Sequence, residues 1–322
     1  MPNTRENLLH YAHPRHWMLW LGLGVLFFLV QLPYPALVRL GGWLGRQSMR
    51  FLKRRLAIAT RNMELCFPDE NARQIKARVT DNFASLGIGL METGMAWFWS
   101  DKRIKKWVEV VGLENLQQAE NKRQGVMVIG VHFMTLELHF RMLGHCQPMT
   151  VMYRPHNNKI MELVQRKGRS RSGNELVSRK KLVGMVHRLK RGGVVWFAPD
   201  QDYGPKGSVF VPFFGVERAA TTNGTFIISR LAKPELVTAV VIRKPGSQGY
   251  QLTISAKLEN YPYDDDLAAA NYINRAIEQE IMKAPEQYLW LHRRFKTRPA
   301  GERSLYVCCA GRILPKKRNV DK

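Results

Sequence analysis

The sequence predicts an α/β fold: a mixed, mainly parallel sheet flanked by helices, with an N-terminal hydrophobic membrane anchor helix. Short apolar runs rich in β-branched residues alternate with segments of helical periodicity. Polar residues follow three of those runs, as they do at the carboxyl edge of a parallel sheet. An uncharged apolar stretch lies near the N-terminus. With 322 residues and 45% hydrophobic content, the chain is long enough for one large domain and an appendage.

The formal net charge of +24 is extreme for a chain of this size. It implies a polyanionic partner: nucleic acid, an anionic membrane surface, a phosphorylated substrate or an acidic carrier protein. The chain has four cysteines, Cys66, Cys146, Cys308 and Cys309, and none forms a C-x-x-C pair. This spacing argues against a zinc site or a disulfide framework and fits a reducing compartment.

The apolar stretch runs from Trp17 to Val30 without a charge, and reaches the roughly 20 residues of a membrane span only if it continues to Val38. Pro33 and Pro35 would bend it there. A single membrane anchor, an interfacial helix and a buried hairpin are the three alternatives. We favour the anchor because Trp17 and other aromatic residues lie near the ends of the stretch. A basic cluster that suits an anionic cytoplasmic leaflet follows at Arg39, Arg46, Arg50, Lys53, Arg54 and Arg55.

The chain is divided accordingly. Residues 1–40 form an N-terminal segment with the anchor at about 17–38, residues 41–306 form the main domain, and residues 307–322 form a basic tail expected to be disordered. Strands are predicted at 108–111, 126–129, 149–153, 194–199, 237–243 and 250–256. Residues 40–100 are predicted to be helical throughout, with a turn and helix start at 68–71. Further helices are predicted at 113–120, 159–165, 181–191 and 267–283. Residues 209–214 are expected to form a hydrophobic patch and residues 220–225 a helix entry with threonine caps.

The most informative stretch is Val126–Phe140, in which a buried strand ends at Gly130 and His132 and Glu137 follow. On a regular helix, five residues turn through roughly 500°, so the two side chains would not share a face. They can meet only if His132 precedes a helix and Glu137 occupies its first or second turn. A carboxylate there can hold one imidazole nitrogen and leave the other free as a base.

Two other predicted strands also end in polar residues. Arg154 follows the strand at 149–153, and Asp200 follows the strand at 194–199. Between them, Arg169 and Arg171 belong to a basic group that would repel itself unless an anion binds, and arginine suits bidentate phosphate contacts. We expect a site at one sheet edge that includes His132, Glu137, Arg154 and Asp200.

Several stretches resemble the late acyltransferases of lipid A biosynthesis. His132 and Glu137 match the HX4D/E motif of the wider glycerophosphate and lysophospholipid acyltransferase superfamily. More specific are HPRHW (13–17), QLPYP (31–35), NMELCFP (62–68), METGMAWFW (91–99), VIGVHFMTLEL (128–138), YRPHNN (153–158), APDQDYGPKGS (198–208), ATTNGT (220–225) and APEQYLWLHRRFKTRP (284–299). The resemblance runs from about His13 to Tyr306. It is strongest to the lauroyl and palmitoleoyl members, with the palmitoleoyl branch favoured by CQPM (146–149), YRPHNN and DQDYGPKGS.

The resemblance implies a glycerophosphate-acyltransferase-like fold and an enzyme of the inner membrane of a Gram-negative bacterium, with its catalytic domain facing the cytoplasm. Such an enzyme moves a fatty acyl chain from acyl carrier protein to a hydroxyacyl chain of Kdo2-lipid IVA. The family's catalytic pair maps onto His132 and Glu137, and its further important residues map onto Arg169 and Asp200. His132 would act as general base and Glu137 would orient it. Arg169 would bind phosphate or the oxyanion, whereas Asp200 would hold Arg169 or Arg154, or cap a turn.

Neither a cofactor nor a metal is predicted. His139 stands near His132, but the spacing is not that of an H-E-x-x-H zinc motif. Two other functions stay open. One is acyl transfer to glycerol phosphate or a lysophospholipid, and the other is a non-enzymatic, basic, membrane-tethered lipid-binding protein. Nucleic acid is not an expected partner because no zinc finger, RNA-binding signature or clear helix-turn-helix is present.

Overall fold

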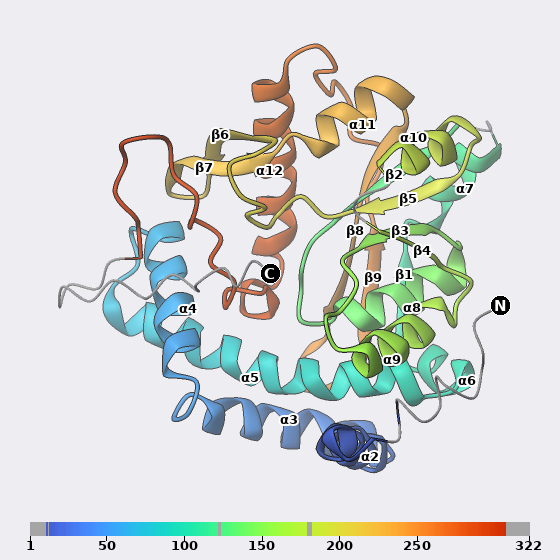
Figure 1. The fold of residues 1–322 in the computed structure, drawn as a ribbon, viewed down its shortest axis with the longest axis vertical. Helices are drawn as coiled ribbons and strands as arrows, with labels where there is room; N and C mark the ends of the chain where they lie inside the picture. The colour runs from blue at the N-terminus through green and yellow to red at the C-terminus, as the bar shows by residue number, and fades with distance from the viewer. Residues whose placement is uncertain (1–10, 12, 122–123, 179–181, 307–322) are drawn as a thin grey trace.

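A seven-stranded sheet forms the centre of the protein, seen in a computed structural model that describes residues 11, 13–121, 124–178 and 182–306 (Figure 1). Its strand order is β1-β9-β8-β2-β5-β3-β4. All neighbouring pairs are parallel except β8 and β9, so the predicted mixed, mainly parallel sheet is confirmed. The strands are β1 (Val108–Val111), β2 (Val126–Gly130), β3 (Thr150–Tyr153), β4 (Glu175–Ser178), β5 (Val194–Phe197), β8 (Glu235–Arg243) and β9 (Tyr250–Ile254).

Helices cover both faces of the sheet and extend beyond its lower end, where the long α5 separates the sheet from α2 and α3 (Figure 1). The α-helices are α2 (Trp17–Leu29), α3 (Tyr34–Ser48), α4 (Lys53–Cys66), α5 (Ala72–Phe98), α6 (Asp101–Lys105), α7 (Leu113–Asn121), α8 (Leu136–Cys146), α9 (Lys159–Ser170), α10 (Leu182–Lys190), α11 (Gly224–Ala232) and α12 (Asp266–Met282). Three short 3-10 helices lie at η1 (Pro14–His16), η2 (Pro245–Ser247) and η3 (Pro285–Gln287).

The unbroken apolar run of β2 follows from its central place in the sheet. Val126 and Val128 belong to the hydrophobic cluster on one side, which includes α8, and Met127 and Ile129 belong to the cluster on the other side, which includes α10 and α12. Successive side chains of a strand point to opposite faces, so a strand buried on both faces is apolar at every position. The turn that follows β2 is therefore fixed by the core.

The N-terminal apolar stretch is not the single helix that was predicted over 17–38. It forms two helices, α2 and α3, separated by residues 30–33. Pro33 is the N-cap of α3, and Pro35 lies in its first turn, where the fixed φ and missing N–H of proline favour a helix start. In the part of the chain that the structure describes, no helix has the length and hydropathy needed to cross a membrane. The predicted segment boundary at residue 40 lies inside α3, and the predicted tail, 307–322, lies outside the described residues.

Helix α3 packs closely against α5 through glycines. A Cβ atom added at Gly87 would lie 2.0 Å from the carbonyl oxygen of Gly41, and one added at Gly45 would lie 2.0 Å from the carbonyl oxygen of Phe83. The two backbones therefore touch without intervening side chains. This contact joins α3 to the helix whose Trp97 hydrogen-bonds to Glu137.

Two other local predictions differ from the structure. The hydrophobic patch predicted at 209–214 falls largely in β6 (Ser208–Phe213), which pairs with β7 (Val216–Thr222) in an antiparallel hairpin outside the main sheet. Residues 220–222 are consequently strand rather than helix entry, and α11 begins at Gly224. Strand β4 was not predicted at all. It is a four-residue edge strand whose sequence ELVS carries little strand signal.

Candidate active site

The turn after β2 has the arrangement that the spacing predicted. His132 precedes α8, and Glu137 lies in the first turn of that helix. The turn is fastened to the segment after α12 by main-chain hydrogen bonds: the N–H of Met134 donates to the carbonyl of Gln287 at 2.8 Å, and the N–H of Leu289 donates to the carbonyl of His132 at 3.0 Å. The segment after α12 thus helps to hold His132 at the carboxyl edge of the sheet.

The carboxylate that holds the His132 imidazole is Asp200. Nδ1 of His132 lies 2.6 Å from Oδ1 of Asp200, and the main-chain N–H of His132 donates to Oδ2 at 2.8 Å. Strands β2 and β5 are parallel neighbours with Ile129 opposite Phe197, and His132 and Asp200 each follow that paired position by three residues. Asp200 is fully buried, whereas the His132 side chain is 17% exposed. The buried acid therefore orients the ring and leaves Nε2 as the free nitrogen.

The predicted contact between Glu137 and His132 is wrong, because no hydrogen bond joins the two among the described residues. Glu137 is bound by Arg169: Nε of the guanidinium lies 3.1 Å from both carboxylate oxygens and Nη2 lies 2.5 Å from Oε1. The indole Nε1 of Trp97 donates to the same carboxylate at 3.1 Å. Glu137 follows His132 by only five residues, but its position in the first turn of α8 directs the Glu137 side chain toward α9.

Each of the arginines around α9 has its own acceptor within the protein. Arg169 pairs with Glu137, Arg171 donates through Nη1 to the main-chain carbonyl of Trp97 at 2.5 Å, and Arg166 lies 4.0 Å from Glu162. The predicted self-repulsion of this group is relieved by acceptors of the protein itself. Arg154 is exposed. Asp200 holds neither Arg169 nor Arg154, which corrects the other expectation for this residue.

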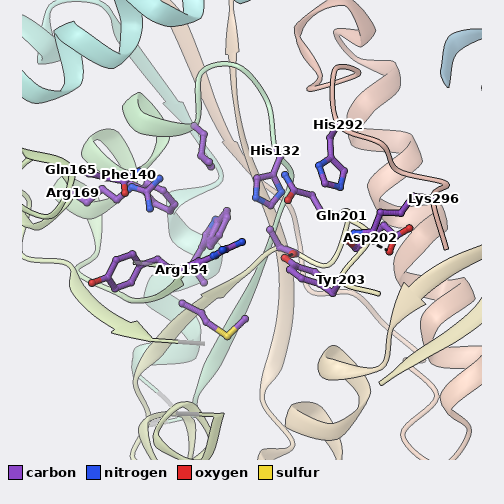
Figure 2. Close-up of a pocket in the computed structure, with 15 residues that line it drawn as sticks. His132, Phe140, Arg154, Gln165, Arg169, Gln201, Asp202, Tyr203, His292 and Lys296 are labelled. Carbon is purple, nitrogen blue, oxygen red and sulfur yellow. Dashed lines mark hydrogen bonds and ion pairs between the residues drawn. The ribbon is translucent and has the colours of Figure 1, made fainter. Parts of the chain in front are cut away.

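A cavity of about 480 Å³ opens beside His132 (Figure 2). Arg154 and Arg169 lie on one side of it, together with Phe140, and His292 and Lys296 lie on the other side, together with Tyr203. The structure therefore brings together His132 and Arg154, which the strand ends predicted, and Arg169, which the basic group and the family resemblance predicted. Arg171 and Glu137 are not among the lining residues.

His292 and Lys296 were missed as site residues. They belong to the segment after Trp290, which reaches the cavity because its backbone is bonded to the His132 turn. The only sequence signal was a run of polar residues directly after the apolar Tyr288–Leu291. Such a run marks a strand end in an α/β protein, but here no strand precedes it.

Burial and charge set the protonation of the groups around the cavity. Burial alone would raise the pKa of Asp200, but the charge and hydrogen bonds of His132 outweigh it, so this pKa lies below its usual value. Asp200 is consequently a carboxylate that accepts the Nδ1 proton of the ring. Burial and then the nearby Lys296 ammonium lower the pKa of His292 to about 4, so its ring is neutral near pH 7.

Within the described ranges, no group of three or more His, Cys, Asp and Glu side chains could hold a metal ion. His139 faces away from the cavity into the core, against the rings of Phe140 and Trp196. Burial lowers the pKa of His139 to about 3. Its Nε2 has no hydrogen-bond partner in the structure.

The fold and this geometry define a class of protein: an α/β protein with a histidine–carboxylate pair at the carboxyl edge of a mainly parallel sheet, beside a cavity lined by arginines. Enzymes use that pair to take a proton from a hydroxyl group or water. The cationic wall suits an anionic substrate.

Comparison with known proteins gives the family. Residues 5–297 match the family described as bacterial lipid A biosynthesis acyltransferase. The chain is 56% identical over 297 residues to the lipid A biosynthesis palmitoleoyltransferase of Escherichia coli, covering 92% of this chain and 97% of that protein. It is 50% identical to the E. coli lauroyltransferase, covering 95% and 100%. It is 42% identical to a lipid A biosynthesis acyltransferase of Haemophilus influenzae, covering 90% and 94%.

The chain therefore belongs to the bacterial lipid A biosynthesis acyltransferases. The predicted family and enzyme class are confirmed, and the higher identity to the palmitoleoyltransferase agrees with the favoured branch. The activity of this protein is thus acyl transfer in lipid A biosynthesis.

Proposed function

We propose that this acyltransferase moves a palmitoleoyl chain, with lauroyl as the second candidate, from acyl carrier protein to a hydroxyl of Kdo2-lipid IVA. The 56% identity to the palmitoleoyltransferase, against 50% to the lauroyltransferase, supports that order. The net charge of +24 suits two anionic partners, an acidic carrier protein and a phosphorylated lipid. No cofactor is needed because a thioester is already an activated acyl donor.

His132 is the general base in this proposal, and the single observation that carries it is the 2.6 Å contact between its Nδ1 and Asp200. Nε2 takes the proton of the acceptor hydroxyl as the hydroxyl oxygen attacks the thioester carbonyl. The resulting tetrahedral intermediate collapses with cleavage of the C–S bond, and the imidazolium returns the proton to the departing thiolate. General-base help of this kind contributes about 10²–10⁴-fold to the rate. Asp200 stabilises the imidazolium, the task that the motif alone gave to Glu137.

Arg169 binds an anionic oxygen of the lipid acceptor. Its Nε and Nη2 are engaged by Glu137, but no described residue hydrogen-bonds to Nη1. Arg169 lines the cavity, so Nη1 is available to a substrate oxygen. Arg154 lines the same cavity and adds a second cation, whereas Arg171 ties the end of α9 to the main chain of α5 at Trp97. Glu137 thus acts on Arg169 rather than on the base.

The acyl-transfer reaction is tested by incubating the purified protein with Kdo2-lipid IVA and an equimolar mixture of lauroyl-, myristoyl- and palmitoleoyl-acyl carrier protein, then measuring the mass of the product lipid. A gain of one palmitoleoyl chain is expected, and none with His132→Ala. A lauroyl or myristoyl gain would overturn the chain-length order. Acylation of glycerol phosphate or a lysophospholipid in parallel incubations, with Kdo2-lipid IVA unchanged, would overturn the acceptor.

We also propose that α2 and the turn between α3 and α4 lie in the interface of the inner membrane. Twelve of the twenty exposed large hydrophobic residues in the described ranges fall between residues 17 and 52, including Met18 at 78%, Phe28 at 74% and Phe51 at 83% exposure. An apolar surface of this kind beside basic residues is typical of proteins that bind a membrane from one side. This placement retains the predicted membrane association without a single-pass span.

Sedimentation with anionic phospholipid vesicles tests the membrane surface. The double variant Met18→Ser/Phe28→Ser is expected to lose most of its vesicle binding. The matched control is Leu267→Ser/Leu231→Ser, which removes two hydrophobic side chains of 52% and 54% exposure elsewhere on the molecule. Equal binding by both double variants would show that α2 does not bind the membrane.

A further inference from the structure

Trp97 contacts the Glu137–Arg169 pair but does not line the cavity. It lies near the end of α5 with only 7% of its surface exposed, and its indole N–H is one of the donors to Glu137. The same ring lies against the backbone of α9. A Cβ atom added at Gly168 would be 2.2 Å from Cδ1 of Trp97, so only glycine allows α9 to approach the indole this closely. Gly168 directly precedes Arg169.

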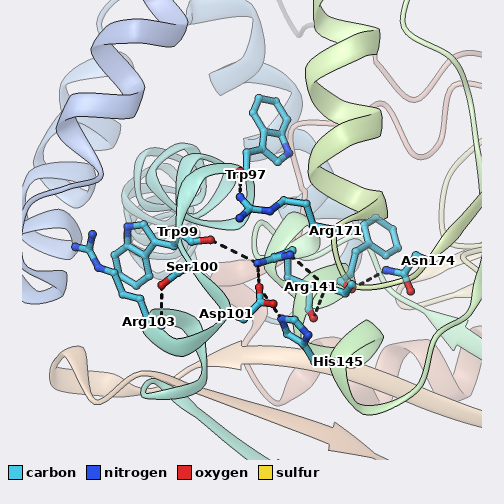
Figure 3. A network of polar contacts seen from close by, with 11 residues as sticks. Trp97, Trp99, Ser100, Asp101, Arg103, Arg141, His145, Arg171 and Asn174 are labelled. Atoms are coloured by element: carbon cyan, nitrogen blue, oxygen red, sulfur yellow. Dashed lines mark hydrogen bonds and ion pairs between the residues drawn. The ribbon is translucent and has the colours of Figure 1, made fainter.

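The main chain of Trp97 holds α9 at a second point, because its carbonyl accepts the hydrogen bond from Arg171. One residue of α5 therefore contacts the residue before Arg169, a residue just after it, and the carboxylate that binds it. Figure 3 shows the carbonyl of Trp97 facing the Arg171 guanidinium. These contacts fix both the backbone and the charge partner of Arg169.

A buried network extends this contact (Figure 3). Arg141, only 1% exposed, hydrogen-bonds to Asp101 and to the main-chain carbonyl of Trp99. Asn174 donates to the carbonyls of Phe140 and Arg169 at 2.8 and 3.2 Å. The ends of α5 and α9 are consequently joined to the middle of α8 by polar groups that burial makes costly to separate.

We propose that Trp97 is a positioning residue for acyl transfer: with Gly168, it orients Glu137 and the end of α9 so that Arg169 presents its free Nη1 to the substrate. This inference rests on the proposed role of Arg169. A free arginine side chain loses rotamer entropy when it is ordered. A carboxylate that is itself held by the indole and the helix backbone orders the guanidinium before the substrate arrives, which is the advantage of preorganisation.

Trp99 provides a matched control. It lies two residues further along, is 2% exposed, and its Nε1 also donates to a buried acceptor, the carbonyl of Val30, at 2.6 Å. Its ring stacks with Arg103 at 3.8 Å and does not contact the Glu137–Arg169 pair. Trp97→Phe and Trp99→Phe remove the same chemical group from the same helix end, but only the first removes a contact with the site.

The experiment is a double-mutant cycle on steady-state kinetics with the lipid acceptor, using Trp97→Phe, Arg169→Ala and the double variant, with Trp99→Phe as control. Trp97→Phe is expected to lower kcat/KM about tenfold, since hydrogen bonds to charged groups are worth about that factor or more. In the Arg169→Ala background, Trp97→Phe should change kcat/KM less than twofold. Trp99→Phe should retain the wild-type kcat/KM while losing as much thermal stability.

The outcomes separate the two proposals. Wild-type kinetics in Arg169→Ala would remove the role of Arg169 itself. An impaired Arg169→Ala with a wild-type-like Trp97→Phe would overturn the positioning role alone. Two results would assign Trp97 to stability only. One is an equal loss of kcat/KM in Trp97→Phe and Trp99→Phe, and the other is a loss of kcat/KM in Trp97→Phe that is undiminished in the Arg169→Ala background.

Discussion

His132 and Asp200 are 68 residues apart in the sequence, yet they form a 2.6 Å contact at the ends of two neighbouring parallel strands. Asp200→Asn keeps the shape of the side chain but removes its charge. An amide at this position favours the wrong ring tautomer and no longer stabilises the imidazolium. We expect kcat to fall about 10²–10⁴-fold with little change in KM. The exposed Asp264→Asn serves as control, and a wild-type kcat in Asp200→Asn would remove Asp200 from the mechanism.

Glu137→Gln should have a different signature. The amide cannot form the ion pair with Arg169, so the guanidinium loses its fixed orientation, whereas the contact between His132 and Asp200 stays intact. The expected result is a KM for the lipid acceptor raised about tenfold or more, with a smaller change in kcat. Steady-state kinetics at several acceptor concentrations measure both. A loss confined to kcat, accompanied by a changed pH–rate profile, would indicate that Glu137 acts on the base after all.

The contact between α3 and α5 predicts a large cost for a single methyl group. In Gly87→Ala, the new Cβ would approach the Gly41 carbonyl oxygen to 2.0 Å, so the two helices must separate. We expect a loss of about 1–3 kcal/mol in the free energy of unfolding. Gly22→Ala is the control, because nothing lies within 4 Å of its Cβ position and alanine is the better helix former. Similar denaturation midpoints for the two variants would contradict the close packing.

His139 should make stability depend on pH. Its pKa in the folded state is about 3, against 6.5 for the ordinary side chain. The unfolded chain therefore binds the proton first, and stability is complete above pH 6.5 and is lost as the pH falls toward 3. Between pH 7.5 and pH 5 this amounts to about 2 kcal/mol.

Urea denaturation at the two pH values measures this effect. His139→Leu should reduce the pH dependence by about that amount, whereas the exposed His187→Gln should leave it unchanged. An unaltered pH dependence in His139→Leu would show that other groups cause it.

Much of the site was predictable because it depends on local sequence. An apolar run such as Val126–Ile129 forms a buried strand wherever helices cover both faces of a sheet, and the turn after it places His132 at the sheet edge. Helix-compatible residues then put Glu137 in the first turn of α8. The family, too, followed from contiguous motifs. The single helix predicted over 17–38 is instead two helices, α2 and α3, because hydropathy carries no information on how both of them pack against α5.

From the sequence alone, His132, Glu137 and Asp200 could be named as candidate site residues, whereas which of them meet depends on the fold. Glu137 and Asp200 are both carboxylates within reach of a histidine at a strand end, and sequence distance favoured Glu137. Strand pairing decided for Asp200, because β5 lies beside β2 in a register that aligns the two turns. The side chain of Glu137 instead points to α9, where Trp97 and Arg169 meet it. Contacts between segments so distant in sequence depend on the packing of the whole chain, which local residue patterns do not specify.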